Sequence, residues 1–129
     1  MYGLNKTIDE YKKYGVDVFL VSQVPQQMIE PVRAYQRAYK SDDDIKNDVL
    51  RELSVSLDEH KRLNAYVSSV INVNPYIKIL NFDKLLCDAQ YCPVGTKTTS
   101  YYFDDDHLSI VGAGRLIPSI EQLLSQSVK

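Results

Sequence analysis

An apolar run from Val16 to Val24 follows a glycine and stops at Pro25, and it limits the folds open to this chain. Its valine, phenylalanine and leucine residues predict a strand, and a nearly unbroken apolar run is typical of a parallel strand covered on both faces. The capping-box pattern Thr7-x-x-Glu10 upstream predicts a helix that ends at Gly15. A helix, a glycine turn and a buried strand make half of a βαβ unit, so we expect an α/β fold.

The remaining residues also alternate between helical and strand patterns. The periodicity predicts helices over 31–39, 45–71 and from 108 onward, a turn at 72–75, a strand over 76–82 and a helical turn over 83–86. A period-two alternation at 53–57 allows a break in the long helix, and Pro118 is expected to kink or divide the last helix. His60 is expected on an exposed face of the long helix. Two strands are few for a free-standing doubly wound sheet, so we expect residues 1–129 to form a single, partial domain.

Charge and composition argue against several classes of partner. The chain has 129 residues and a formal net charge of −2, so its charge does not favour nucleic acid or anionic lipid as a partner, and we expect no nucleic acid. Its longest apolar run is too short to span a bilayer, and we expect no signal peptide in residues 1–129, because polar residues such as Asn5 and Lys6 follow Met1.

The sequence contains two cysteines, Cys87 and Cys92. A zinc site needs about four ligands, and no second cysteine pair exists. The spacing favours a disulfide, which would indicate an oxidising compartment, and two unrelated thiols are the alternative.

The segment from Tyr101 to Ser109 contains the most specific chemistry. Asp104 precedes His107 by three residues, which allows the carboxylate to accept a hydrogen bond from the imidazole, as in the base half of a Ser-His-Asp triad. No Gly-Asp-Ser or Gly-x-Ser-x-Gly nucleophile motif occurs in the sequence. One histidine among adjacent acids is not expected to supply a convergent ligand set, so we expect no metal and no other cofactor. Ser109 fits a helix N-cap better than a nucleophile.

Four features together resemble a known family. They are Gly15 with the following strand and Val24-Pro25, a helix with Ser56-Leu57-x-x-His60 and Asn64, a strand followed by Cys87 and Cys92, and the Tyr101-to-Ser109 segment with Gly112-Ala113. In this order they resemble the carboxyl-terminal half of an SGNH (GDSL-like) domain. The match is to the form attached to membrane acyltransferases of the acyltransferase-3 family, which O-acetylate cell-surface polysaccharides.

The resemblance implies a flavodoxin-like three-layer α/β/α sandwich, present as a partial domain. By position, His107 would be the catalytic base and Asp104 its orienting carboxylate, and Cys87 and Cys92 would be disulfide-linked. Gly3-Leu4-Asn5 faintly matches a family block whose asparagine donates to the oxyanion, which makes Asn5 a weak candidate.

The same resemblance implies an acyl donor and a sugar or polysaccharide acceptor. It also implies a parent protein linked to a membrane acyltransferase domain, on the extracytoplasmic (periplasmic) side of the membrane. Without the serine, this chain alone is expected to be nearly inactive, and a non-catalytic binding or assembly module with a degenerate SGNH fold is the alternative. An exposed sheet edge would favour a homodimer.

Overall fold

The computed structural model describes residues 2–71 and 75–127, which form two compact units. The first unit takes its described residues from 2–23, 61–71 and 75–81, and the second from 24–60 and 82–127. Each unit contains helices and short strands, and the α/β class expected from the sequence is confirmed.

The first unit begins with helix α1, Tyr2–Lys13. The helix ends in a Schellman motif, because the Gly15 amide donates to the Lys12 carbonyl at 3.0 Å and the Val16 amide to the Tyr11 carbonyl at 3.2 Å. Gly15 has a φ of 69°, a conformation that glycine adopts without steric cost, so the predicted stop is confirmed. The prediction of a capping box that begins at Thr7 is wrong, because Thr7 lies inside the helix and its hydroxyl donates to the Gly3 carbonyl.

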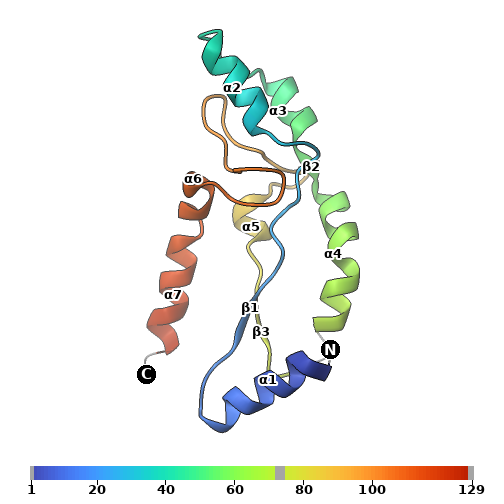
Figure 1. Ribbon diagram of the computed structural model, residues 1–129, viewed down its shortest axis with the longest axis vertical. Helices are drawn as coiled ribbons and strands as arrows, with labels where there is room; N and C mark the ends of the chain where they lie inside the picture. The colour runs from blue at the N-terminus through green and yellow to red at the C-terminus, as the bar shows by residue number, and fades with distance from the viewer. Residues whose placement is uncertain (1, 72–74, 128–129) are drawn as a thin grey trace. The chain divides into compact units, whose positions relative to one another are not determined.

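The two predicted strands are parallel neighbours, shown side by side in Figure 1. β1 (Phe19–Val21) pairs with β3 (Lys78–Leu80), and the register places Leu20 opposite Ile79. The side chains of β1 are half-buried or exposed, so the expectation of a strand buried on both faces is wrong. Among the described residues this sheet has two strands, and each strand is therefore an edge. The predicted turn at 72–75 lies largely outside the described residues.

The second unit contains the break that the sequence allows in the long helical pattern. After α2 (Val32–Lys40), the chain forms α3 (Asn47–Leu53), then β2 (Val55–Ser56), then α4 (Leu57–Ile71), whose last residues belong to the first unit. The Ser56 hydroxyl accepts a hydrogen bond from the Glu59 amide at 3.1 Å, which is the N-cap interaction that starts a helix.

A second sheet of two strands forms the core of this unit. β2 pairs antiparallel with β4 (Tyr91–Cys92), and Val55 lies opposite Cys92. Both of these residues are fully buried, together with Val94 and Tyr102. The residues of the Asp104-to-His107 loop follow directly after this core.

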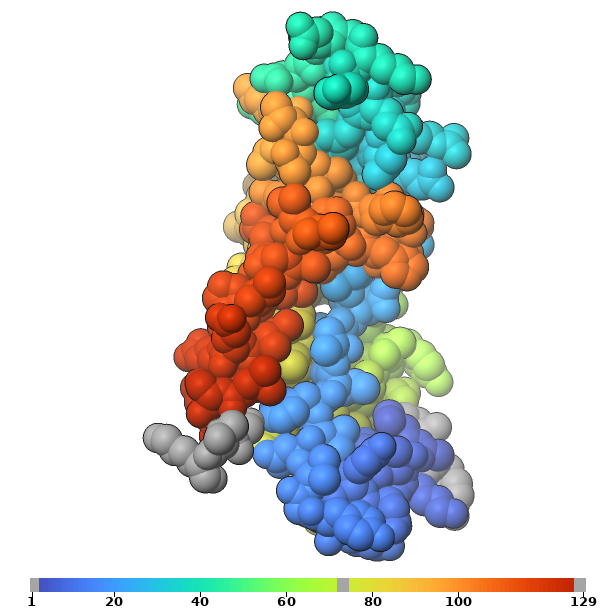
Figure 2. All heavy atoms as spheres, turned by 60° about the vertical axis from the view of Figure 1, so that its left-hand side comes forward, coloured from blue at the N-terminus to red at the C-terminus, as the bar shows by residue number. Residues whose placement is uncertain are grey.

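The chain then ends in two helices rather than one. These helices are α6 (Ile110–Gly114) and α7 (Ile117–Ser127), so the predicted C-terminal helix is divided before Pro118. Earlier in the unit, the short helix α5 (Asp83–Leu86) precedes β4. Pro118 lies in the first turn of α7, where proline is tolerated because its missing amide has no helical partner. The C-terminal segment that contains α7 is red in Figure 2. The apolar side chains of Ile117 and Leu124 on α7 are exposed.

Gly112 explains how α6 approaches the segment before the candidate loop. A Cβ atom at this position would collide with the Tyr101 carbonyl oxygen. That oxygen accepts the Ser109 amide at 2.9 Å, and the Ser109 hydroxyl accepts the Gly112 amide at 3.1 Å. Ser109 is therefore the N-cap of α6, as the sequence predicts.

Candidate functional site

The loop that carries Asp104 and His107 is closed by backbone contacts at its base. Tyr102 forms an antiparallel bridge with Leu108, and the Phe103 amide donates to the His107 carbonyl at 2.7 Å. Inside the loop, one oxygen of Asp104 (Oδ1) accepts the Asp106 amide at 3.0 Å and the His107 amide at 2.7 Å. These two bonds fix the carboxylate beside the imidazole.

The His107 ring is held by the carboxylate that the sequence singles out. Its Nδ1 lies 3.0 Å from both Oδ1 and Oδ2 of Asp104. A carboxylate only accepts hydrogen bonds, so this contact selects the tautomer with the proton on Nδ1. The ring is 74% exposed, and its Nε2 makes no hydrogen bond with any residue that the structure describes. The neutral ring therefore presents an unprotonated Nε2 that can take a proton.

Asp106 is a second carboxylate at the same nitrogen. Its Oδ1 lies 2.8 Å from the His107 Nδ1. The sequence prediction missed this residue, since it assigned a role only to the acid three positions before the histidine. The signal was the run of three consecutive aspartates, because a tight loop brings neighbouring acids to the same ring.

Both partners of the pair have shifted acidities. The hydrogen bond that the His107 ring donates to Asp104, then the charge of Asp104 and the charge of Asp106, raise the pKa of His107 above 6.5. Desolvation acts to raise the pKa of Asp104, but the backbone hydrogen bonds from His107 and Asp106, with the His107 side chain, together lower it below its usual value of 3.8. The carboxylate thus stays ionised and stabilises an imidazolium.

The ligand atoms of Asp104, Asp106 and His107 do converge, because they lie within 4.8 Å of one another. The expectation that adjacent acids around one histidine cannot converge is therefore wrong. A metal ion would have to replace the proton that Nδ1 shares with the two carboxylates, since the same nitrogen makes both contacts. The arrangement as it stands is that of a hydrogen-bonded base.

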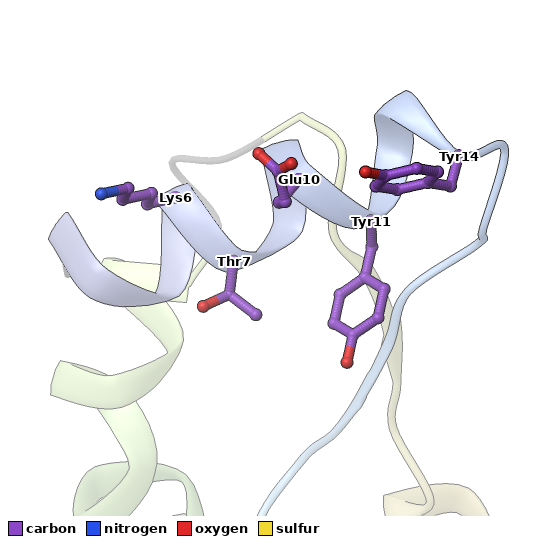
Figure 3. A pocket seen from close by; sticks show the side chains of 5 residues that line it. All are labelled: Lys6, Thr7, Glu10, Tyr11 and Tyr14. Atoms are coloured by element: carbon purple, nitrogen blue, oxygen red, sulfur yellow. The ribbon is translucent and has the colours of Figure 1, made fainter.

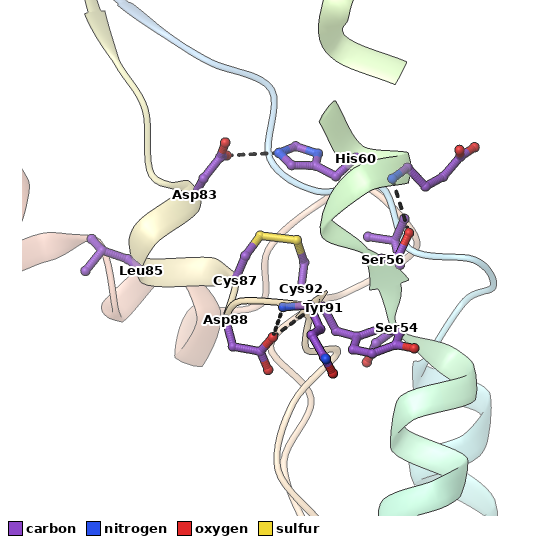
Figure 4. The surroundings of a disulfide bond; sticks show 12 residues. Ser54, Ser56, His60, Asp83, Leu85, Cys87, Asp88, Tyr91 and Cys92 are labelled. Carbon is purple, nitrogen blue, oxygen red and sulfur yellow. Dashed lines mark hydrogen bonds and ion pairs between the residues drawn. A yellow bond between two sulfur atoms is a disulfide. The ribbon is translucent and has the colours of Figure 1, made fainter. Parts of the chain in front are cut away.

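The two cysteines form a disulfide, shown in Figure 4. Between them, the chain turns on Asp88, whose carboxylate accepts the Gln90 and Tyr91 amides at 2.7 Å each. These two bonds hold the pKa of Asp88 below its usual value. The turn places Cys92 on β4, in the core beside the candidate loop.

His60 is buried, so the expectation of an exposed helix residue is wrong. Its side chain is 3% exposed, and its Nε2 lies 2.9 Å from an oxygen of Asp83 at the start of α5 (Figure 4). Helical periodicity places His60 among charged neighbours, but α4 packs this side against α5. The pair joins two elements next to the disulfide, since Cys87 directly follows α5.

Asn5, the weak oxyanion candidate, lies in α1 of the first unit. The same helix lines a pocket formed by Lys6, Thr7, Glu10, Tyr11 and Tyr14 (Figure 3). This pocket contains no histidine or cysteine among its lining residues, and the oxyanion role of Asn5 stays a prediction.

A known protein family matches most of the chain. A family model described as "SGNH domain (fused to AT3 domains)" matches residues 2–122. The chain belongs to this family. Neither a curated protein nor a solved structure gives a significant match. In the described part of this SGNH chain, no helix is both long and apolar enough to cross a membrane.

Proposed function

We propose that Asp104 and His107 are the carboxylate and base of a Ser-His-Asp triad in an SGNH-type acyltransferase or esterase. The observation that carries the proposal is the contact of His107 Nδ1 with both oxygens of Asp104 at 3.0 Å, with Nε2 left open on an exposed ring. A triad base needs this arrangement, because one ring nitrogen must be fixed while the other receives a proton.

In the proposed reaction, a serine hydroxyl attacks the carbonyl carbon of an acyl donor, and His107 Nε2 takes the hydroxyl proton. The tetrahedral intermediate collapses to an acyl-serine, and His107 returns the proton to the departing group. A sugar hydroxyl, or water, then attacks the acyl-serine while His107 again takes and returns one proton. Asp104 stabilises the imidazolium at both steps.

The serine of this mechanism belongs to a segment other than residues 1–129, because these contain no Gly-Asp-Ser block. The family description, an SGNH domain fused to AT3 domains, supports a membrane acyltransferase as the linked partner. It also supports an activated acyl donor and a cell-surface polysaccharide acceptor. The disulfide supports a location on the extracytoplasmic side, where such bonds persist.

The first test is the in-frame DNA sequence upstream of the Met1 codon. A Gly-Asp-Ser block preceded by hydrophobic spans is expected. A stop codon directly upstream would overturn the proposed enzyme and favour the non-catalytic module, which the missing serine block supports.

The second test measures acyl transfer and ester hydrolysis by the protein expressed with its upstream coding sequence. His107→Gln is expected to lower turnover by about 10⁶-fold. Asp104→Asn, which removes the charge and keeps the shape, is expected to lower it by about 10⁴-fold. Asp44→Asn, an exposed acid in another loop, is the matched control and should leave turnover unchanged. Full activity in His107→Gln would refute the triad.

We also infer that the isolated chain forms a homodimer through a sheet edge. Both strands of the β1–β3 sheet are edges among the described residues, and Val21 and Ile79 on them are exposed. Light scattering of the purified chain should give the mass of a dimer. A monodisperse monomer at high concentration would contradict this inference.

A further inference from the structure

Gln27 is a buried polar side chain that the proposed triad does not use. It is 3% exposed, and both ends of its amide are hydrogen-bonded. Its Nε2 donates to the Cys92 carbonyl at 3.2 Å, and its Oε1 accepts the Val55 amide at 3.0 Å. Val55 and Cys92 are directly opposite each other in the β2–β4 sheet. The side-chain amide of Gln27 therefore joins both strands of this sheet.

The backbone of Gln27 contacts the candidate site. Its backbone N–H donates to the Asp105 carbonyl at 2.6 Å. Next to it, the Gln26 side chain donates from Nε2 to Oδ2 of Asp105 at 3.0 Å. Asp105 stands between the carboxylate of Asp104 and the histidine of the pair. Two consecutive glutamines thus hold the middle of the loop.

These contacts form one continuous path through the second unit. It runs from the β2–β4 sheet to the side-chain amide of Gln27, and from the backbone N–H of Gln27 to the backbone of Asp105. Cys92, at the sheet end of the path, also forms the disulfide. The three aspartates of the loop are half-buried and the His107 ring is exposed, so water competes with the bonds between Asp104 and His107. The attachment of Asp105, which stands between these two residues, to the buried sheet can hold the loop in the conformation that brings them together.

We propose that Gln27 is a positioning residue for the Asp104–His107 pair, anchoring its loop to the β2–β4 sheet with the help of Gln26. This inference rests on the proposed function, because it assigns the anchor to the base of that triad. A buried polar group without a hydrogen-bond partner destabilises the fold. Because the Gln27 side chain bonds both the Val55 backbone N–H and the Cys92 carbonyl, the backbone of Gln27 is held in one place. A misplacement of about 1 Å can lower a rate by roughly 100-fold.

The anchor can be tested on the 129-residue chain by the tautomer of His107. Nitrogen NMR, recorded well above the pKa of the ring, separates a proton on Nδ1 from a proton on Nε2. The wild type should show the Nδ1–H form. Gln27→Met keeps the size of the side chain but loses both hydrogen bonds, and it should give a mixture of tautomers. Gln36→Met, the same change on α2, outside these contacts, is the matched control.

One further variant keeps the test decisive if Gln27→Met does not fold. Gln26→Ala removes only the exposed bond to Asp105 and should shift the tautomer partly. An unchanged Nδ1–H signal in folded Gln27→Met, or in Gln26→Ala where Gln27→Met does not fold, would overturn the anchor.

Activity of the longer protein provides the readout for the catalytic consequence. Gln27→Met should lower kcat by about 100-fold with little change in KM, because the pair is displaced while substrate contacts remain. If His107→Gln is fully active, the proposed function fails even though the NMR result stands. If His107→Gln is inactive but Gln27→Met is fully active, the triad stands and the anchor fails.

Discussion

Reduction of the Cys87–Cys92 disulfide isolates the contribution of one cross-link to stability. The two cysteines are separated by 5 positions in the sequence. For a closed loop of this size, the chain-entropy relation gives an entropy change of about 7 cal/mol/K, or about 2 kcal/mol at 25 °C. We therefore expect the reduced chain to lose about 2 kcal/mol of unfolding free energy.

The native turn should survive reduction, which is why the loss is assigned to the unfolded state. The Asp88 carboxylate still accepts two amides, and the Asp88 amide still donates to the Tyr91 carbonyl at 2.8 Å. Cys92 remains on β4, paired with Val55. The reduced fold therefore keeps its contacts, and only the freedom of the unfolded chain increases.

Urea unfolding with and without a phosphine reductant measures this loss. The chain has 10 tyrosines and no tryptophan, so tyrosine fluorescence and far-ultraviolet circular dichroism are the probes. With a slope of about 2 kcal/mol/M, the midpoint should fall by about 1 M at constant slope. An unchanged midpoint would refute the entropic argument. A loss of about 4 kcal/mol or more would show that the native contacts of β4 also depend on the bond.

Three other perturbations test the site and its surroundings. Because Asp104 raises the pKa of His107, Asp104→Asn should lower that pKa toward 6.5 in an NMR titration. In the wild type, the stability that the raised pKa of His107 contributes is fully present below pH 6.5 and is lost as the pH rises through the pKa of His107 in the folded chain. Gly112→Ala should destabilise the fold by roughly 2 kcal/mol or more in thermal unfolding, because the new Cβ meets the Tyr101 carbonyl, and a neutral result would contradict the close approach. Burial raises the pKa of Tyr102 to about 12, against a smaller lowering by the neighbouring Gln27 side chain. The Gln27 amide is already bonded to Cys92 and Val55, and the Tyr102 hydroxyl has no hydrogen bond of good geometry within the described residues. Tyr102→Phe should therefore raise the unfolding free energy by about 1 kcal/mol at neutral pH. The stability that neutral Tyr102 contributes is lost as the pH rises from about 10 through 12, so the advantage of the variant should grow there, as alkaline unfolding would show.

Local backbone chemistry explains what the sequence predicts well. Gly15 ends α1 because a left-handed residue is needed there, and Ser109 begins α6 because its hydroxyl accepts an amide of the first turn. Both signals act over a few residues, so no tertiary information is required. The Asp104–His107 contact belongs to the same class, since a separation of three residues in a closed loop brings the two side chains together.

Tertiary packing explains what the sequence does not predict. His60 lies among charged residues in the sequence, and only the approach of Asp83 shows that it is buried. Gln27 follows Pro25-Gln26 in an apparently ordinary loop, and its role depends on Val55 and Cys92, which are distant along the chain. Periodicity compares each residue with its sequence neighbours and gives no information on such pairs.

Because His107 is exposed, its two neighbouring carboxylates influence the protonation of the ring both in water and during the proposed reaction. In water, Asp104 and Asp106 stabilise the protonated ring, so part of the histidine is already charged near neutral pH and cannot act as a base. In the proposed reaction, a serine and an acyl donor would cover Nε2 and remove water from the ring, and desolvation would then disfavour the charged form. The carboxylates would offset that penalty when the proton arrives. Activity should therefore rise with pH through the pKa of His107. In Asp106→Asn, which leaves Asp104 as the only acid at Nδ1, the rise should occur at lower pH, and an unmoved profile would remove Asp106 from this account.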